Sequence, residues 1–347
     1  MTWDGLSFPE FAQGCSSLLS RHLTRQMFDN LKGAETSHGF TFSQAINSGI
    51  LNQDSHVGVY AGDAESYTLF APLFDPIIEE YHGFSTQNVH QSDMDIDTLS
   101  LSNPDPEGDF IYSSRIRVGR NLAEMPLGPA LSKEQRNYIE SLVAGSLRDL
   151  TGDLAGTYYP LSGMDEKIQS QLIADHFLFK AGDRFLDAAG LNRDWPEGRG
   201  IFHNQDKTFL VWVNEEDQLR IISMQQGGDF PAVFKRLRKA VKEIETSVSF
   251  SYDSRLGYLT SCPTNLGTAM RASVHVCLPK LGADKASFKK ITDQYHLQIR
   301  GIDGEHSDSE SCVFDVSNRR RLGVTEVECI LDMYNGVVAL INKEKQL

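Results

Sequence analysis

The sequence predicts an α+β protein, with a small all-helical N-terminal domain before a larger domain whose antiparallel β-sheet is flanked by helices. Three observations lead to this class. The first ninety residues show the apolar spacing of helices. An acidic, proline-containing stretch follows them, and 347 residues suit one large domain or two unequal ones. Beyond that stretch, strand-like runs joined by short polar turns predict hairpins, whereas a parallel sheet needs regular strand–helix alternation.

The helical domain is predicted over residues 1–90. Helical spacing occupies residues 16–31 and 64–81, and residues 47–62 form a polar, glycine-containing loop. Residues 91–109 hold six acidic side chains, two prolines and little apolar periodicity. They are therefore predicted to be a solvated linker, which leaves residues 110–347 for the larger domain.

The larger domain mixes predicted strands and helices. The predicted strands are residues 110–118, 208–213, 219–224, 271–278 and 297–301. A capping box at Ser132 and Gln135 opens one helix, and an apolar stripe over residues 233–244 follows an N-cap at Asp229. Residues 325–341 are predicted to close the chain as an amphipathic helix.

Composition excludes several classes of function. The formal charge is −14, which disfavours binding to nucleic acid or to an anionic membrane surface. No apolar run approaches the roughly 18 residues of a membrane span, and no secretory signal is visible. The five cysteines are odd in number, scattered and without CxxC spacing, which argues against a disulfide framework and a structural zinc site. We therefore expect a reduced, cytoplasmic protein.

Arginines on predicted strands are the most informative feature. They are Arg115, Arg117, Arg220, Arg271 and Arg300. Arg115 and Arg117 are two residues apart, so both project from one face, and Arg271 shares its face with Ser273 and His275. Lone arginines on apolar strands need a counter-charge. Internal carboxylates are one source, and a polyanion held by guanidinium groups is the other.

A second constellation lies in the turn between two predicted strands. Cys262 precedes a proline there, and it is either a buried bystander or a thiolate stabilised by a nearby cation. Glu216 lies in a turn between strands and Glu305 in a glycine-containing loop, where surface charge is the default interpretation.

The run Cys262–His275, CPTNLGTAMRASVH, resembles the signature of the ATP:guanidino phosphotransferases, the phosphagen kinases. The resemblance extends to residues 75–83, 156–163, 175–180 and 212–229, and so covers nearly the whole chain. Arg-Ala-Ser-Val-His after the cysteine motif resembles the arginine-kinase form, since creatine kinases carry a glycine pair there.

The resemblance implies reversible transfer of the γ-phosphoryl group of MgATP to a guanidino substrate, with L-arginine giving phosphoarginine and ADP as an energy buffer. ATP or ADP would be bound with Mg²⁺, the metal being held through phosphates and water and not directly by side chains. The implied ATP-binding residues are Arg115, Arg117, His176, Arg220, Arg271, Ser273, His275 and Arg300.

The same resemblance assigns the guanidino substrate to Ser55, His56, Val57, Tyr60, Glu216, Cys262 and Glu305. Glu216, Glu305 and Cys262 would be catalytic. A guanidinium is protonated and non-nucleophilic in water, so two carboxylates can orient it and one can accept its proton. Cys262, as a thiolate, would add negative charge beside the non-reacting nitrogen.

His56 departs from the family pattern, because arginine kinases normally carry glycine after the serine of this loop. Either the imidazole turns to solvent, or it narrows the pocket and favours another guanidino acid such as taurocyamine; Tyr60 favours arginine. Asp54 and Arg184 match a pair that links the two domains in family members. Family members are monomers or homodimers, and nothing in the sequence decides between them.

One rival enzyme class also acts on guanidino groups. Amidinotransferases and deiminases use a cysteine nucleophile without ATP, so Cys262 would then be the nucleophile. The five strand arginines would have no role in such an enzyme. A non-catalytic nucleotide-binding regulator would be expected to lack a carboxylate or an arginine, and all the matching positions are present.

Overall fold

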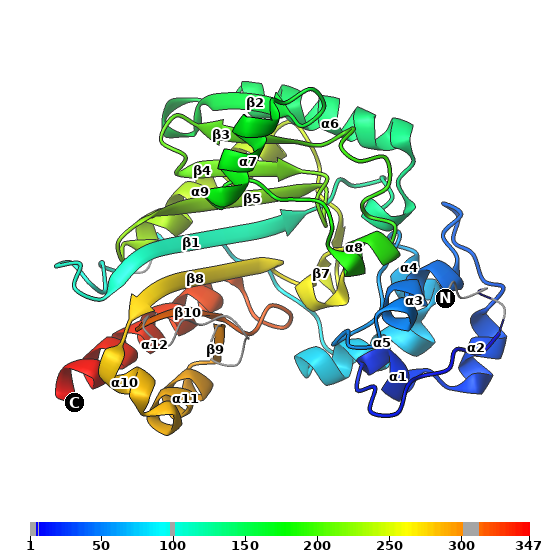
Figure 1. The fold of residues 1–347 in the computed structure, drawn as a ribbon, viewed down its shortest axis with the longest axis horizontal. Coiled ribbons are helices and arrows are strands. Elements are labelled where there is room, and N and C mark those ends of the chain that lie inside the picture. Colours follow the sequence, from blue (N-terminus) through cyan, green and yellow to red (C-terminus); the bar gives the residue numbers. More distant parts are fainter. Residues whose placement is uncertain (1–4, 6, 98–100, 301–311) are drawn as a thin grey trace.

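The computed structural model describes residues 5, 7–97, 101–300 and 312–347. A helical domain lies beside one end of a larger domain built on an eight-stranded antiparallel sheet (Figure 1). The predicted fold class is therefore confirmed. The predicted boundaries at residues 90 and 109 stay a prediction.

The small domain contains five helices within the described residues. They are α1 (Leu18–His22), α2 (Arg25–Leu31), α3 (Phe42–Leu51), α4 (Ser66–Leu69) and α5 (Ala71–His82). The helical region predicted over residues 16–31 is two helices, because Leu23 leaves helical geometry and the Thr24 side chain caps the second helix. The predicted loop over residues 47–62 is wrong for its first five residues, since a capping box at Thr41 and Gln44 starts a helix that runs to Leu51.

The sheet has the order β2-β3-β4-β5-β1-β8-β10-β9. Its strands are β1 (Ile111–Arg120), β2 (Gly156–Pro160), β3 (Gly200–Asn204), β4 (Phe209–Val213), β5 (Leu219–Gln226), β8 (Met270–Cys277), β9 (Leu297–Arg300) and β10 (Val313–Asn318). All neighbours are antiparallel, and β4 and β5 form the predicted hairpin. A two-stranded sheet pairs β6 (Tyr252–Asp253) with β7 (Gly257–Tyr258).

Helices cover the two faces of the sheet unequally. Three long helices pack on one face and form the main core with it: α6 (Lys133–Arg148), α9 (Phe230–Glu245) and α12 (Glu326–Gln346). The predicted caps at Ser132 and Asp229 and the predicted α9 stripe are confirmed. The remaining helices are α7 (Glu166–Ala174), α8 (Arg184–Ala188), α10 (Pro279–Ala283) and α11 (Lys285–Gln294). On the other face, a smaller cluster centred on Trp212 packs under residues 161–179 at the β2 to β4 end, so the rest of that face is left to polar side chains.

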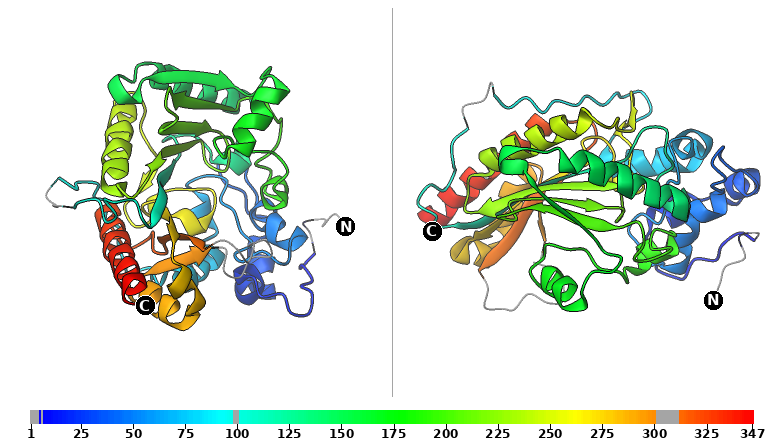
Figure 2. Two further views of the ribbon diagram at one scale, coloured as in Figure 1. Left: turned by 60° about the vertical axis from the view of Figure 1, so that its left-hand side comes forward. Right: turned by 90° about the horizontal axis from the view of Figure 1, so that it is seen from above.

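The segment 91–109 is more tightly packed than a solvated linker. Ile96 is buried in the main core, and Ser92 and the backbone of Asp93 donate hydrogen bonds to Glu326 at the start of α12. Asp105 accepts hydrogen bonds from the backbone N–H groups that begin β1. Residues 91–97 run along the helical side of the sheet, as Figure 2 shows. Most of the other described residues of the segment are exposed and lie outside helices and strands, so the linker assignment stays a prediction.

The small domain shares its core with the larger one. Its apolar cluster also contains five leucines from the larger domain: Leu127, Leu256, Leu259, Leu266 and Leu322. Tyr67 donates a hydrogen bond to the backbone carbonyl of Thr260, at 2.7 Å. The two domains therefore meet through buried apolar surface.

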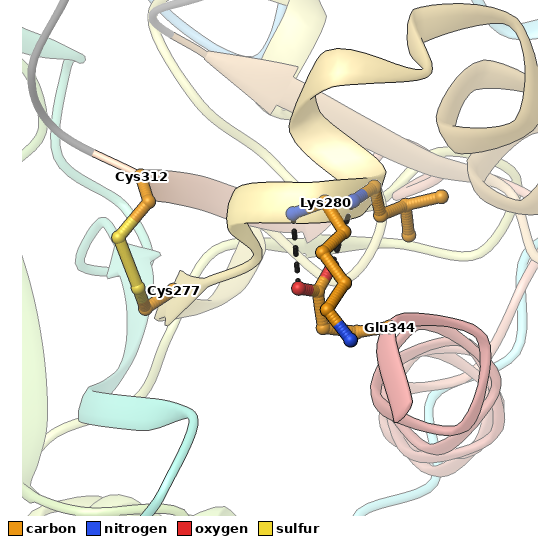
Figure 3. The surroundings of a disulfide bond; sticks show 5 residues. Cys277, Lys280, Cys312 and Glu344 are labelled. Carbon is orange, nitrogen blue, oxygen red and sulfur yellow. Dashed lines mark hydrogen bonds between the residues drawn. A yellow bond between two sulfur atoms is a disulfide. The ribbon is translucent and has the colours of Figure 1, made fainter. Parts of the chain in front are cut away.

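A disulfide joins Cys277, at the end of β8, to Cys312, just before β10 (Figure 3). The expectation of reduced thiols is wrong for this pair. Their separation of 35 residues carries no signal in the sequence, and only the pairing of β8 with β10 brings them together. Cys15, Cys262 and Cys329 are free.

Within the described part of the chain, no helix combines the length and apolar character that crossing a bilayer requires.

Candidate active site

The five strand arginines lie on one face of the sheet, called here the arginine face. Strand register fixes this, because Arg117 pairs with Arg271 and the remaining three follow the same alternation across β5, β1 and β9. Trp212 belongs to this face, and its ring lies 5.5 Å from the guanidinium carbons of both Arg115 and Arg220. The prediction that Arg115 and Arg117 share a face is confirmed.

Only two of these arginines have carboxylate partners among the described residues. Arg220 contacts Glu215 at 2.7 Å and Glu216 at 3.0 Å, while Arg271 contacts Asp315 at 2.7 Å. The other three have no salt bridge within the described ranges, and Nε of Arg115 and of Arg271 is buried without a hydrogen-bond partner. Internal carboxylates therefore balance the positive charge of this face only in part.

The unbalanced charge is visible in the arginine pKa values. Arg220, followed by burial, lowers the pKa of Arg117 well below its usual range. Burial, followed by Arg220 and Arg271, lowers the pKa of Arg115 to about 10. Like charges crowded at low dielectric repel one another, and an anion placed among them removes that penalty. The face therefore fits a polyanion such as a phosphate chain.

A cavity of about 380 Å³ opens where the arginine face meets the small domain, and we call it the junction cavity. Its lining includes every described residue predicted for guanidino binding: Ser55, His56, Val57, Tyr60, Glu216 and Cys262. Arg117 and Arg220 line it as well, so it is continuous with the arginine face. Glu305 lies outside the described residues.

The small-domain wall of this cavity is the loop of residues 55–60, which hydrogen bonds from α1 and α3 hold in place. The carbonyls of His56 and Val57 accept hydrogen bonds from α1, and that of Gly58 accepts one from Gly49. A side chain at Gly49 would meet the Gly58 carbonyl at 2.4 Å, so this close approach requires glycine. Among described groups, the N–H groups of residues 56–59 donate no hydrogen bond. They are available to an acid group in the cavity.

The catalytic-domain wall comes from two turns tied together. Asp217, in the β4–β5 turn, accepts hydrogen bonds from Asn121 and from the N–H of Ser261. Ser261 in turn donates to the carbonyl of Glu216. These contacts hold the Glu216 turn beside the Cys262 turn. The Ala61 N–H also bonds the Ser261 carbonyl, at 2.8 Å, so the small-domain loop joins the same structure.

Glu216 is a partly buried acid, and two cations, Arg220 and Arg117, favour its charged form. Burial raises its pKa to about 7, even though the adjacent Arg220 favours the charged form. A carboxylate with a pKa near neutrality is suited to accept and return a proton.

Cys262 is buried, and its sulfur lies 3.2 Å from the hydroxyl of Thr264. Burial, followed by the charge of Glu216, raises its pKa to about 12. The expected thiolate is therefore not favoured by the protein's own groups, and Cys262 is a thiol here. A cation bound beside the sulfur would lower this pKa.

Arg321 supports the Cys262 turn and was not predicted. Its guanidinium donates to the carbonyl of Thr264 at 2.9 Å and to the side chain of Asn265 at 3.0 Å. Asn265 in turn lies 3.4 Å from a carboxylate oxygen of Glu216. Tyr81 and Asp183 also line the junction cavity. No sequence spacing signals these residues, because they come from separate elements.

The other predicted residues lie on the arginine face, after α7 and in the small-domain loop. Ser273 and His275 lie on the arginine face, and Nδ1 of His275 is 3.1 Å from the hydroxyl of Ser113. His176 follows α7, exposed, and does not line the junction cavity. The ring of His56 is exposed and packs edge-on against Tyr81, with centroids 5.8 Å apart.

Asp54 and Arg184 lie together across the two domains. Arg184 donates two hydrogen bonds to the Asp54 carboxylate, one of them at 2.8 Å. Side chains of α3 reinforce this contact, since Asn47 and Ser48 donate to backbone carbonyls of α8.

No group of three or more His, Cys, Asp or Glu side chains gathers as a metal site in the described ranges.

Comparison with known proteins identifies the family. The model of the ATP:guanido phosphotransferase C-terminal catalytic domain matches residues 138–347, and the model of the N-terminal domain of the same family matches residues 13–79. The chain belongs to the ATP:guanido phosphotransferase family. It is 53% identical to an arginine kinase of Penaeus vannamei, over 97% of this chain and 95% of that protein. It is also 56% identical to an arginine kinase of Anthopleura japonica, of which it spans 48%.

Solved structures of this family agree with the fold. A lombricine kinase superposes with a TM-score of 0.90 at 38% identity, covering 98% of this chain and 94% of that one. The duplicated taurocyamine kinase of Schistosoma mansoni gives 0.88 at 41% identity, covering 94% of this chain and 46% of that one. Family membership excludes the deiminase and amidinotransferase alternative, so this chain is a phosphagen kinase.

Proposed function

We propose that this phosphagen kinase reversibly transfers the γ-phosphoryl group of MgATP to L-arginine. One observation carries the proposal. The junction cavity brings a small-domain loop with available N–H groups, the partly buried acid Glu216 and the thiol Cys262 to the edge of the arginine face. An amino acid with a guanidino group needs one wall to bind its acid group and the other to bind its guanidinium.

The arginine face would hold the phosphates of the nucleotide. Its fit rests on the orphaned Nε atoms of Arg115 and Arg271 and on the mutual repulsion that depresses the pKa of Arg117. Mg²⁺ would arrive with the nucleotide and withdraw charge from its phosphates. The arginines stabilise the charge that the transferring group spreads over its oxygens.

Glu216 would orient the guanidinium and accept one of its protons as the nitrogen becomes nucleophilic. Its carboxylate accepts from Arg220 and faces Asn265, so its position is fixed before the substrate arrives. Cys262 lies beside it, and the substrate's own positive charge favours the thiolate there. In the reverse direction, protonated Glu216 returns the proton.

The available N–H groups of residues 56–59 would bind the α-carboxylate of arginine, with Tyr60 near its α-amine. His56 does not block them, because its exposed ring packs against Tyr81. This arrangement supports arginine over a guanidino sulfonate. The proposal includes a cytoplasmic location.

Steady-state kinetics tests the substrate. ATP turnover is measured with arginine, taurocyamine, creatine, glycocyamine and lombricine, for the wild type and for His56→Gly. We expect arginine to give the highest kcat/KM by at least tenfold, and the variant to retain that order. A higher kcat/KM for taurocyamine, or an order reversed by His56→Gly, contradicts the assignment to arginine.

A further inference from the structure

We propose that Cys277 and Cys312 form a reversible thiol-oxidation site at the rim of the arginine face. The pair would exchange with low-molecular-weight disulfides such as glutathione disulfide. Their Cα atoms are 5.0 Å apart, inside the range that a disulfide spans. Both residues are half-buried, so small thiols and disulfides can reach them.

The backbone holds the two cysteines together without help from the sulfur–sulfur bond. The N–H of Leu278 donates to the carbonyl of Cys312 at 2.8 Å, and the N–H of Cys277 donates to that of Phe110 at 2.8 Å. Val313 is the strand partner of Cys277. The reduced thiols therefore stay adjacent, and each is present at high effective concentration for the other.

The chain that follows Cys277 is anchored as well. Both oxygens of Glu344 on α12 accept backbone hydrogen bonds from the start of α10, at 3.0 Å from Lys280 and 2.7 Å from Leu281 (Figure 3). Reduction would therefore open a bond between two fixed strands and leave the fold in place.

The chemistry is ordinary thiol–disulfide exchange. One cysteine thiolate attacks glutathione disulfide, forming a mixed disulfide and releasing one glutathione thiolate. The second cysteine attacks the mixed disulfide, forms the Cys277–Cys312 bond and releases the second glutathione. Two protein thiols have then lost two electrons and two protons, and one glutathione disulfide has gained them.

The position of the pair connects it to the arginine face. Alternation along β8 puts Cys277 on the same face as Arg271 and His275, two residues beyond the latter. On β10, Asp315 pairs with Arg271 at 2.7 Å. The covalent link would limit the residual motion at this end of the β8–β10 pair further than its backbone hydrogen bonds do, so the oxidised form should bind nucleotide about two- to fivefold more tightly. This second part rests on the proposed function, whereas the thiol chemistry does not.

Thiol counting tests the first part. The full-length protein is equilibrated with mixtures of glutathione and glutathione disulfide, quenched, denatured and alkylated for mass spectrometry. We expect five alkylated cysteines under reducing conditions and three under oxidising ones, with a Cys277–Cys312 linked peptide. Cys15→Ser, a matched control outside the pair, should still lose two thiols, and Cys277→Ser should form no intramolecular link.

Two results would overturn the proposal: five thiols at every ratio, or a linked pair that millimolar dithiothreitol fails to reduce in the native protein. Calorimetric titration with MgADP tests the second part without any turnover. Equal affinities of the oxidised and reduced forms would remove the connection to nucleotide. Because neither measurement uses arginine, failure of the substrate assignment would leave both interpretable.

Discussion

The arginine face concentrates positive charge, whereas the junction cavity holds a carboxyl group with a raised pKa, and the two are built from different kinds of structure. Regular strands carry the arginine face, and its cations repel one another in the absence of an anion. Turns and loops from both domains make the junction cavity, where a partly buried acid has a raised pKa. On the proposed function, the phosphates of a nucleotide would reduce the repulsion among the arginines, and a bound guanidinium would favour the charged form of the acid.

Glu216→Gln should give the largest effect, because it removes the proton acceptor while keeping the shape of the cavity. We expect kcat to fall by about 10²–10⁴-fold with little change in nucleotide affinity. Glu107→Gln, at an exposed position, is the matched control. A loss below tenfold would show that proton transfer depends on another group.

Arg117→Met tests whether repulsion among the arginines destabilises the nucleotide-free protein. Activity should fall by about 10²–10³-fold, because one donor to the phosphates is lost. The charge of Arg117 is disfavoured in the folded protein, so its removal should raise the free energy of unfolding of the nucleotide-free protein by about 1 kcal/mol. Thermal unfolding with Arg148→Met as control measures this. A less stable Arg117→Met variant would contradict the proposed strain.

The pH dependence tests the junction cavity, because burial raises the pKa of Glu216 to about 7. As the base for phosphoarginine formation it must be unprotonated, so kcat/KM should fall about tenfold per pH unit below about 7. In the reverse direction Glu216 must be protonated, and this dependence should invert. An acidic limb near pH 4 in the forward direction would mean that burial does not shift this acid.

Asp54→Ala should give the smallest effect. The pair with Arg184 is exposed, and exposed ion pairs contribute little. We expect the synergy between the two substrates to weaken by about threefold or less, as measured by the KM for one at saturating and low levels of the other. Unchanged synergy would assign the pair no part in coupling the two regions.

The difference between the strands of the arginine face and the loops of the junction cavity also explains which features could be predicted from the sequence. Alternation along strands is local, so the shared face of Arg115 and Arg117 followed from two residues of spacing. The resemblance supplied Cys262 and the loop residues 55–60, which no periodicity marks. Tyr81 and Arg321 were missed because their role depends on how distant elements pack. The disulfide was missed for the same reason, since the β8–β10 pairing alone brings Cys277 to Cys312.

The leucines that the larger domain contributes to the small domain's core have a consequence for engineering and for evolution. A chain cut near residue 90 would leave these five leucines of the larger domain without their partners, and that fragment would expose an apolar patch. Division of the chain at this point would therefore cost both fragments part of their buried apolar surface. A chimera that exchanges the first ninety residues between relatives should keep the apolar contacts of these five leucines, because losing them would lower its stability.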